Sequence, residues 1–469
     1  MIPKNILSNH NYKNSKFNIL FEQNGKVFIF NTLRGSFLEI TPTNRSIYQW
    51  LGDATSYIIK DNVNNFHERW VKLGPKAREN LLLGGFIIPP SFDEFEYLKF
   101  KNKAERYRRD YYSLTVALTY ACNMGCIYCY ENAPLKSGSM SLKTAQQLIA
   151  YIEGIIKDGC KNIDITWYGG EPMIKYPLIV SLSRKIINLA RKNKVQYKAS
   201  IITNGTLLTR RKAKILKKYH VDSAQITLDG PAIVHDQRRP LKTGPSFESI
   251  LKNILDVHDV IHINIRCNVD KTNSEKIAQL VDILKQKGLS DKVAISFAPV
   301  NNGPKKVDSR MACAGNICSR KLYSYKTFSK IQTRLQDYAS SSGFYKPSLP
   351  NQKFNACTAD RINGVVVEPN GNLVKCWESL GDKEENIGNL EKGITLSTTA
   401  LRWLNYDPFS YKKCKVCKML PICMGWCPAR VMTLKSEWSC QTLRYNLVNQ
   451  LIKYCEYAKK GGEINGNNN

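Results

Sequence analysis

Residues 113–133 of the chain read SLTVALTYACNMGCIYCYENA, an apolar run followed by three closely spaced cysteines. Cys122, Cys126 and Cys129 follow a segment whose residues favour a β-strand. Cysteine thiolates hold iron–sulfur clusters, and a cubane cluster has four irons to ligate. Three ligands leave one iron open, and an open position distinguishes catalytic from structural sites in zinc proteins. Because a zinc site or three core cysteines also fit this spacing, the rest of the chain must decide.

The length and composition of the chain predict a cytoplasmic globular protein. Its 469 residues favour about three domains, and a hydrophobic content of 43% is ordinary for chains that bury a core. No apolar run reaches the roughly 18 residues of a transmembrane helix, and residues 1–16 lack the apolar stretch of a signal peptide. Fifteen cysteines in such a protein indicate metal ligands rather than disulfides, and we expect no membrane contact.

The formal net charge of +30 indicates either an acidic partner or a lysine-rich, well-solvated surface. An acidic peptide, an acidic electron-donor protein and a nucleic acid would each suit that charge. Lys and Arg are spread along the chain, and no basic run is long enough for a nucleic-acid-binding arm. Nucleic acid is therefore not the expected partner.

Residues 1–112 predict a small amino-terminal module. Residues 17–40, FNILFEQNGKVFIFNTLRGSFLEI, alternate β-rich runs with Asn-Gly and Arg-Gly turns. Helices are expected after Thr41-Pro42, around residues 66–73 and around residues 79–89. The charged residues 96–112 are expected to form a linker helix.

Six apolar runs in residues 113–310 alternate with helical patterns, which predicts βα units, parallel strands and right-handed crossovers. Ser141 is the expected N-cap of one of these helices, at residues 142–159. Functional residues of such barrels lie at the carboxyl ends of the strands. The expected strands are residues 113–119, 162–169, 198–204, 223–230, 262–269 and 293–299.

Polar and glycine residues follow these strands where a ligand site is expected. Glycine lets backbone approach a ligand closely, an acidic side chain can accept from an ammonium group, and an arginine suits a carboxylate. Alternation puts Arg266 and Asn268 on one face of their strand and Cys267 in the core. The candidates in chain order are Gly169, Gly170, Glu171, Pro172, Thr203, Asn204, Asp229, Arg266 and Asn268.

Residues 311–455 carry seven further cysteines at regular spacing, and residues 456–469 have the composition of a disordered tail. Thirteen residues separate Cys357 from Gly371, and four more precede Cys376. Residues 365–376, VVVEPNGNLVKC, predict a hairpin with an Asn-Gly turn. The remaining five cysteines follow the pattern C-x2-C-x5-C-x3-C-x12-C, at Cys414, Cys417, Cys423, Cys427 and Cys440.

These motifs resemble the radical SAM superfamily with a carboxy-terminal SPASM domain. The C-x3-C-x2-C loop, the GGEP turn at residues 169–172 and the LDG…HD..R run from Leu228 carry the resemblance in the barrel, and the seven later cysteines match SPASM. The resemblance implies an α/β fold: a partial (β/α)6 TIM-like barrel, a winged-helix-like module before it and a cysteine-rich iron–sulfur domain after it. In that family S-adenosylmethionine (SAM) binds the open iron and is cleaved to a 5′-deoxyadenosyl radical.

The resemblance also implies cofactors and their ligands. Three [4Fe–4S] clusters are implied, one held by the Cys122, Cys126 and Cys129 triad. Cys357, Cys376 and Cys427 would hold auxiliary cluster I, whose fourth ligand is Cys318, Cys313 or an open position. Cys414, Cys417, Cys423 and Cys440 would hold auxiliary cluster II. SAM would meet the candidate residues above and Tyr128, which matches an aromatic residue beside the adenine. Arg239 is expected to pair with Asp236, and the catalytic base is not identified.

The function implied is modification of a ribosomally made precursor peptide by hydrogen-atom abstraction. The expected product is an intramolecular thioether from a Cys sulfur, of the sactipeptide or ranthipeptide kind. The leader would bind the amino-terminal module, and flavodoxin or ferredoxin would supply electrons. The alternatives are carbon–carbon cyclophane crosslinking or epimerisation of a peptide, a formylglycine-type sulfatase maturase, and a non-catalytic electron-transfer protein. Sulfatase maturases carry Asp after the second SPASM cysteine, where this chain has Trp377.

Overall fold

The structure is a computed structural model that describes residues 12–40, 75–129, 138–301, 313–314, 317–318, 321–434 and 440–459. Two of the helices expected in the amino-terminal module, after Thr41 and at residues 66–73, lie outside these residues. The carboxy-terminal tail beyond residue 459 also lies outside them.

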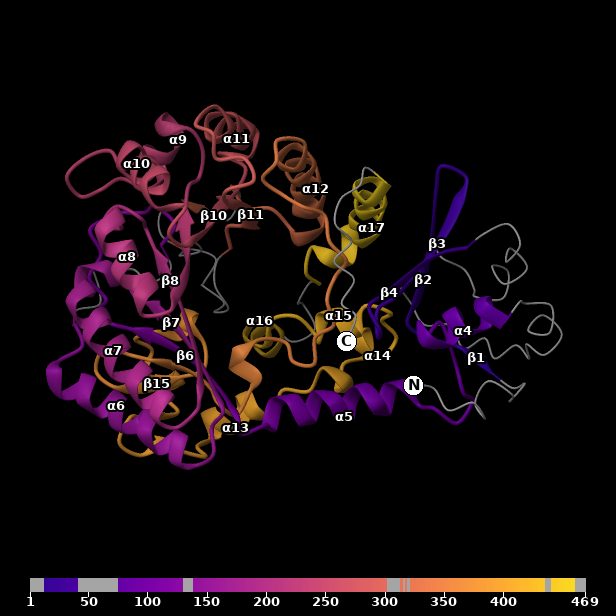
Figure 1. Ribbon diagram of the computed structural model, residues 1–469, viewed down its shortest axis with the longest axis horizontal. Helices are drawn as coiled ribbons and strands as arrows, with labels where there is room; N and C mark the ends of the chain where they lie inside the picture. The colour runs from indigo at the N-terminus through magenta and orange to yellow at the C-terminus, as the bar shows by residue number, and fades with distance from the viewer. Residues whose placement is uncertain are drawn as a thin grey trace.

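Six described strands form a curved parallel sheet in sequence order, and helices follow them along its outer rim (Figure 1). This confirms the predicted α/β barrel, and the sheet is open because its outer strands do not pair with each other. The strands are β6 (Tyr111–Ala117), β7 (Asn162–Tyr168), β8 (Gln196–Thr203), β9 (Val221–Thr227), β10 (His262–Val269) and β11 (Ala294–Pro299). The helices are α6 (Leu142–Lys157), α7 (Tyr176–Lys192), α8 (Arg210–Lys218), α9 (Ala232–Arg238), α10 (Phe247–Val257) and α11 (Ile277–Gln286).

The same sheet continues beyond β6 into the cysteine-rich part of the chain. Strand β14 (Gly364–Val367) pairs in parallel with β6, and β15 (Asn372–Val374) returns antiparallel beside it. The predicted Asn-Gly hairpin is confirmed, since Gly371 takes the left-handed φ of +89° that its turn requires. Strands β16 (Gly388–Asn389) and β17 (Gly393–Ile394) complete the order.

The amino-terminal module contains the predicted hairpins. Strands β2 (Asn18–Gln23), β3 (Lys26–Asn31) and β4 (Ser36–Ile40) form an antiparallel sheet. Helix α4 (Pro75–Leu83) ends sooner than expected, because Gly85 has a φ of +66° and the chain then enters β5 (Ile87–Ile88). Strand β5 pairs with β1 (Lys13–Asn14).

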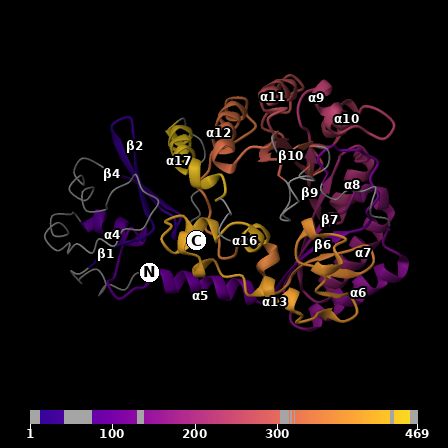
Figure 2. The ribbon, with the colours of Figure 1, turned by 180° about the vertical axis from the view of Figure 1, so that it is seen from behind.

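Both faces of the amino-terminal sheet are covered. Leu20 and Ile29 pack with Leu81 and Leu82 of α4 on one face. On the other face, apolar side chains from β2 and β3 pack against α17 (Leu443–Lys459). The ribbon of α17 lies beside this sheet in the view from behind (Figure 2). Helix α17 in turn contacts α12 (Tyr325–Ser341), which lies beside β11. The carboxy-terminal helix thus joins the amino-terminal module to the barrel.

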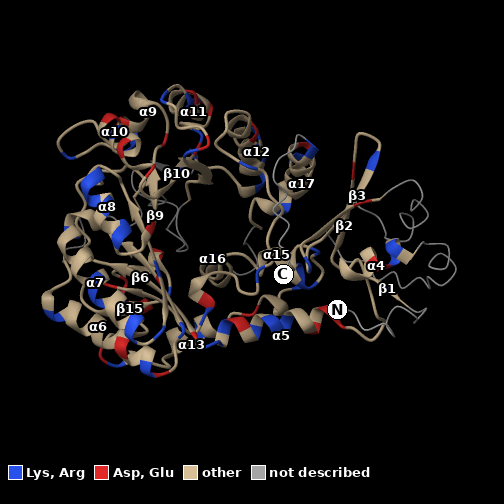
Figure 3. Ribbon diagram, in the orientation of Figure 1, with Lys and Arg blue, Asp and Glu red and all other residues tan. Residues whose placement is uncertain are grey.

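Helix α5 (Glu94–Tyr107) was expected to be a linker, and its Leu98 packs with Tyr406, Phe409 and Cys414 of the cysteine-rich region. Its Arg106 is buried and donates to the carbonyl oxygens of Asp360 (2.9 Å) and Leu404 (2.8 Å). Charged residues lie on most of the outer helices, α5 and α8 among them (Figure 3). None of the helices described is both long enough and apolar enough to cross a membrane.

Candidate active site

The three-cysteine loop lies at the carboxyl end of β6 and is held by backbone hydrogen bonds to the segment after α9. Gly125 N donates to the Pro240 carbonyl (2.8 Å), and Ile127 N donates to the Arg238 carbonyl (3.0 Å). Within the loop, Cys129 N donates to the Cys126 carbonyl (3.2 Å). Residues more than a hundred positions apart in the sequence therefore fix the shape of the loop.

The Gly169-Gly170 pair packs directly against the start of this loop. The N–H groups of Gly170 and Glu171 donate to the carbonyls of Thr119 and Ala121, both at 2.9 Å. A Cβ on Gly170 would lie 2.5 Å from the Tyr120 and Ala121 oxygens, closer than real contacts allow. The glycines are thus required because two backbones touch, and the contact positions the cysteines.

Replacing Gly170 by alanine should displace the cysteine loop. Overpacking of this kind costs about 1–3 kcal/mol, and we expect loss of iron from the site together with a lower melting temperature. Gly154→Ala is the matched control, because a Cβ at Gly154 in α6 meets nothing within 4 Å and alanine favours a helix. Equal iron contents and melting temperatures in the two variants would contradict the assignment.

Glu171 is completely buried and already occupied by protein donors. Its carboxylate accepts from Met173 N (2.9 Å), Thr203 Oγ1 (2.7 Å) and Asn204 N (2.7 Å). Burial raises the pKa of Glu171, and these three bonds act against that rise. Glu171 also caps the short 3-10 helix Pro172–Lys175, with Pro172 in its first turn. In this structure the Glu171 carboxylate joins β7 to β8, and its expected role toward an ammonium group stays a prediction.

Asn204 continues this connection to the cysteines. Its Nδ2 donates to Asn123 Oδ1 (2.8 Å) and lies 3.9 Å from Cys122 Sγ. Its Oδ1 accepts from Thr206 Oγ1 (2.7 Å). Thr203 and Asn204, expected to meet a ribose, thus support the loop in this structure.

Asp229 lies at the end of β9 and is likewise fully buried. Its carboxylate accepts from Tyr128 Oη (2.6 Å) and from Asn268 N (2.9 Å), and Arg238 Nε lies 3.4 Å away. A buried carboxylate needs such partners to offset its lost hydration. The Tyr128 ring, the candidate neighbour of an adenine, has the Arg238 guanidinium 5.2 Å from its centroid.

The expected pairing of Arg239 with Asp236 is wrong. Asp236 Oδ1 accepts from Ser246 N (2.7 Å) and Phe247 N (2.8 Å), at the start of α10. Arg239 instead donates to Tyr128 Oη (2.9 Å). Helix α9 ends at Arg238, so the next side chain turns toward the cysteine loop rather than back along the helix.

His235 of α9 is buried as a neutral imidazole. Its Nδ1 accepts from Asp229 N (3.2 Å), and its Nε2 makes no hydrogen bond within the described residues. Burial lowers the pKa of His235 well below its usual 6.5, and the nearby Arg239 and Arg238 lower it further.

This burial predicts a pH dependence of stability. Below about pH 6.5 the unfolded chain binds a proton at His235 and the folded chain does not, so stability falls as pH falls, by about 1.4 kcal/mol per unit. His235→Asn keeps a hydrogen-bond acceptor. In this variant the denaturation midpoint should fall less steeply between pH 7.5 and pH 5.5 than in the parent. His262→Asn at an exposed position should leave the slope unchanged; a slope unaltered in both variants would contradict the prediction.

Arg266 and Asn268 share one face of β10, as alternation predicts, and Arg266 Nε donates to Asn268 Oδ1 (2.9 Å). Arg266 also acts electrostatically on Glu378 from the cysteine-rich region. Burial raises the pKa of Glu378, while Arg430 and Arg266 lower it. One carboxylate oxygen, Glu378 Oε2, has no hydrogen-bond partner among the described residues, and Arg430 lies 3.9 Å from it.

The triad thiols suit a metal cluster. Burial raises the pKa of Cys126 to about 12 and also raises that of Cys122, while Arg239 lowers both pKa values and Cys129 raises both. A buried thiol of this kind is inert alone, but a metal displaces its proton. In the part of the chain that the structure describes, no three Cys, His, Asp or Glu side chains are arranged for one metal ion. Ligands of a cubane bind different irons and need not converge on one point.

The seven later cysteines separate into two groups in space. A cavity beside α15 (Leu420–Cys423) is lined by all four cysteines implied for auxiliary cluster II, namely Cys414, Cys417, Cys423 and Cys440. Cys376 and Cys427 pack together around Ala359, Trp403 and Ala429. The thiols of Cys357, Cys376 and Cys427 act electrostatically on one another.

The sharp turn between Cys423 and Cys427 explains how neighbouring cysteines reach different groups. Met424, Gly425 and Trp426 have φ angles of +49°, +78° and +72°, three left-handed residues in succession. A left-handed backbone conformation is strained for residues other than glycine. Tyr406 Oη donates to the Gly425 carbonyl (2.9 Å) and helps to hold it.

The remaining cysteines are placed as follows. Cys313 and Cys318 are backbone partners in the hairpin β12 (Cys313–Ala314) and β13 (Ile317–Cys318), and the structure describes no more of them. Cys160, Cys267 and Cys455 are buried with apolar neighbours. All thirteen cysteines for which side chains are described are free thiols.

Three functional candidates were missed by the sequence analysis. Arg238, Glu378 and Arg444 all make contacts that depend on distant parts of the chain. The signal for Arg238 was present in the Arg238-Arg239 doublet, because both arginines of a buried doublet need partners. The other two lie near cysteines but outside any motif.

Residues 116–284 match the family model described as the radical SAM superfamily. A serine-type anaerobic sulfatase-maturating enzyme of Klebsiella aerogenes is 24% identical over 328 residues, which cover 66% of this chain and 78% of that protein. The uncharacterized protein MJ0907 of Methanocaldococcus jannaschii is 34% identical over 146 residues, 30% of this chain. The present chain spans only 46% of the length of MJ0907.

Two solved structures share the fold. The structure of anSMEcpe with bound AdoMet aligns with a TM-score of 0.53 at 19% identity, over 74% of this chain and 97% of that one. Streptococcus suis SuiB bound to its precursor peptide SuiA aligns with a TM-score of 0.50 at 16% identity, over 91% and 98%. The three-cysteine loop and most strands of the barrel lie within the matched residues 116–284, which form a radical SAM domain. That family implies a [4Fe–4S] cluster and SAM.

Proposed function

We propose that this enzyme modifies a ribosomally made precursor peptide and closes a thioether from a Cys sulfur to a carbon. The observation that carries the proposal is that the seven later cysteines, which have the spacing of a SPASM domain, form two separate groups in space. These groups suit two auxiliary clusters, which would act as electron acceptors in an oxidative crosslinking reaction. SuiB, of similar fold, was solved with a precursor peptide.

Cys122, Cys126 and Cys129 would hold the SAM-binding cluster, Cys357, Cys376 and Cys427 auxiliary cluster I, and the four cysteines of the α15 cavity auxiliary cluster II. When bound, the triad cluster and SAM supply a 5′-deoxyadenosyl radical. Gly170 and Glu171 hold the loop in shape, while Arg239 places a positive charge beside Cys126. Arg266 and Glu378 offer opposite charges to a polar substrate at the end of β10.

The precursor leader would bind the edge of the amino-terminal sheet. Both faces of that sheet are covered, and among the described strands none pairs with the outer edge of β2 or β4. An added strand satisfies its backbone groups at such an edge. The proposal therefore assigns the leader to an edge of the sheet rather than to a face.

The chemistry balances as a two-electron oxidation. One carbon loses a hydrogen atom, the Cys thiol loses its proton, and the new C–S bond leaves one surplus electron. The cysteines of the two later groups would hold auxiliary clusters able to take up that electron, and a flavodoxin or ferredoxin would be its final acceptor. The peptide loses two hydrogens and one free thiol.

The test is anaerobic incubation of the enzyme with SAM, a reductant and each small peptide encoded beside its gene. A thioether predicts a product lighter by two hydrogens that has lost one alkylatable thiol. A carbon–carbon crosslink loses two hydrogens but keeps its thiols, and epimerisation changes no mass. Either outcome would overturn the thioether. Absence of deoxyadenosine would instead indicate an electron-transfer protein.

A sulfatase-type maturase is the second candidate, favoured by the extent of the Klebsiella aerogenes match. Trp377 stands where that family carries its acidic base, and it stacks on Tyr168 with ring centroids 5.8 Å apart. Glu378, one residue later, provides a buried carboxyl near Arg266. Conversion of a sulfatase-derived Cys peptide to an aldehyde would establish this activity.

A further inference from the structure

Arg444, in the first turn of α17, makes a direct contact with one of the cysteines of the α15 cavity. Its Nη1 donates to Cys417 Sγ at 2.9 Å, and Arg444 also lines the cavity that holds Cys414, Cys423 and Cys440. No sequence motif assigns a role to this residue. The contact is a charge-assisted hydrogen bond to a sulfur that would be an iron ligand.

Arg444 is half-buried, and within the described ranges no Asp or Glu forms an ion pair with it. Cys440 is influenced by Arg444 and by Lys413, and Cys423 by Lys353. The sulfur cavity therefore lies among cations.

The other cysteine group has a different electrostatic environment. Asp360 acts on Cys357, and Glu378 acts on Cys376 and Cys427. Arg106 and Arg430 are near these carboxylates, at 3.5 Å from Asp360 and 3.9 Å from Glu378. Negative and positive charges are thus paired around this group, whereas in the part of the chain that the structure describes no carboxylate forms an ion pair with Arg444 beside the α15 cavity.

Reducing an iron–sulfur cluster adds one negative charge to it. A cation that donates an N–H to a ligand sulfur stabilises the reduced form more than the oxidised form, and hydrogen bonds to sulfur are among the factors that set cluster potentials. Charge-assisted hydrogen bonds are also stronger than neutral ones. The expected direction is therefore a higher potential.

We propose that Arg444 raises the reduction potential of the cluster held by Cys414, Cys417, Cys423 and Cys440. This makes that cluster the favoured site for a surplus electron. The inference rests on the proposed auxiliary clusters but not on the identity of the peptide product. Arg444 acts through Cys417 and is a positioning residue rather than a catalytic one.

The test is an EPR-monitored redox titration of the full-length, reconstituted enzyme, with the signal of this cluster identified by its loss in Cys423→Ala. Arg444→Met keeps the aliphatic stem and removes the charge and the donors. We expect the ratio of reduced to oxidised cluster at a fixed potential to fall about tenfold, which is about 59 mV for one electron. Arg444→Lys, which keeps the charge, should lie between this variant and the parent.

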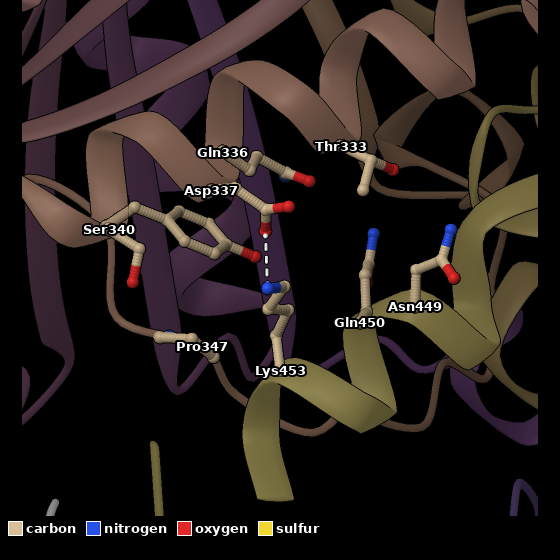
Figure 4. Close-up of a pocket in the computed structure, with 9 residues that line it drawn as sticks. Thr333, Gln336, Asp337, Ser340, Pro347, Asn449, Gln450 and Lys453 are labelled. Atoms are coloured by element: carbon tan, nitrogen blue, oxygen red, sulfur yellow. Dashed lines mark ion pairs between the residues drawn. The ribbon is translucent and has the colours of Figure 1, made fainter. Parts of the chain in front are cut away.

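Lys453→Met is the matched control, because it removes one positive charge from the same helix. Lys453 lies 3.6 Å from Asp337 of α12, in a pocket that no cysteine lines (Figure 4). Its midpoint should equal that of the parent. Equal midpoints in Arg444→Met and Lys453→Met would overturn the inference.

Two further outcomes are decisive. If Arg444→Met lacks the cluster, Arg444→Gln takes its place, and loss of the cluster there too would make Arg444 an assembly residue and overturn the inference. If the parent itself holds no cluster at these cysteines, the proposed auxiliary cluster fails instead. Iron content and the EPR spectrum of the parent distinguish the two failures.

Discussion

Replacing Cys126 by alanine should abolish the release of 5′-deoxyadenosine from SAM. Cys126 is one of three thiols at the end of β6, and a cubane with two protein ligands in place of three has lost a strong thiolate bond. Because cleavage depends on electron transfer from that cluster, partial activity is not expected. The measurement is nucleoside formation by the anaerobic, reduced protein, together with iron per chain.

Cys267→Ala is the matched control, since Cys267 lies in the same barrel but in its apolar core. This variant should keep cleaving SAM and lose only packing energy. Deoxyadenosine formation at the parent rate in Cys126→Ala would refute the assignment of the triad. Equal loss in both variants would show that the barrel, rather than the cluster, had failed.

Local sequence patterns predicted the barrel well. Strand β10 occupies the residues that its alternation indicated, with Cys267 in the core and Arg266 beside Asn268. The period of the apolar residues and the residue types in a turn depend only on neighbours in the chain. A single sequence is therefore enough to predict strands, helices and turns from them.

Pairings between distant residues could not be predicted in the same way. Nothing in the hairpin at residues 365–376 indicates that β14 lies in parallel beside β6, some 250 positions earlier. The strand-end side chains show the same limit. Glu171 and Asp229 occupy the expected places, but which donors satisfy a buried carboxylate depends on neighbouring strands and loops. Motifs therefore indicated a candidate site, while the structure revealed the partners of its side chains.

Arg238→Met should destabilise the enzyme strongly, because Arg238 is a buried cation with two buried carboxylates beside it. Its Nη1 lies 2.9 Å from Asp270 Oδ2, its Nε lies 3.4 Å from Asp229 Oδ2, and all three side chains are almost fully buried. Nη1 also donates to Thr272 Oγ1 (2.7 Å). Removing one partner of a buried pair costs about 3–5 kcal/mol, since the other charge is left without compensation.

The matched comparison is Arg210→Met, which breaks the exposed pair with Asp259 on the surface of the barrel. Exposed pairs contribute little because water and salt screen them, so its denaturation midpoint should hardly change. The gap between the two variants should persist at high salt, since buried charges are screened much less than exposed ones. Equal destabilisation would mean that Arg238 only fills space. A large loss confined to Arg238→Met, accompanied by loss of triad iron, would instead show that this arginine couples the ends of β9 and β10 to Tyr128 in the cysteine loop.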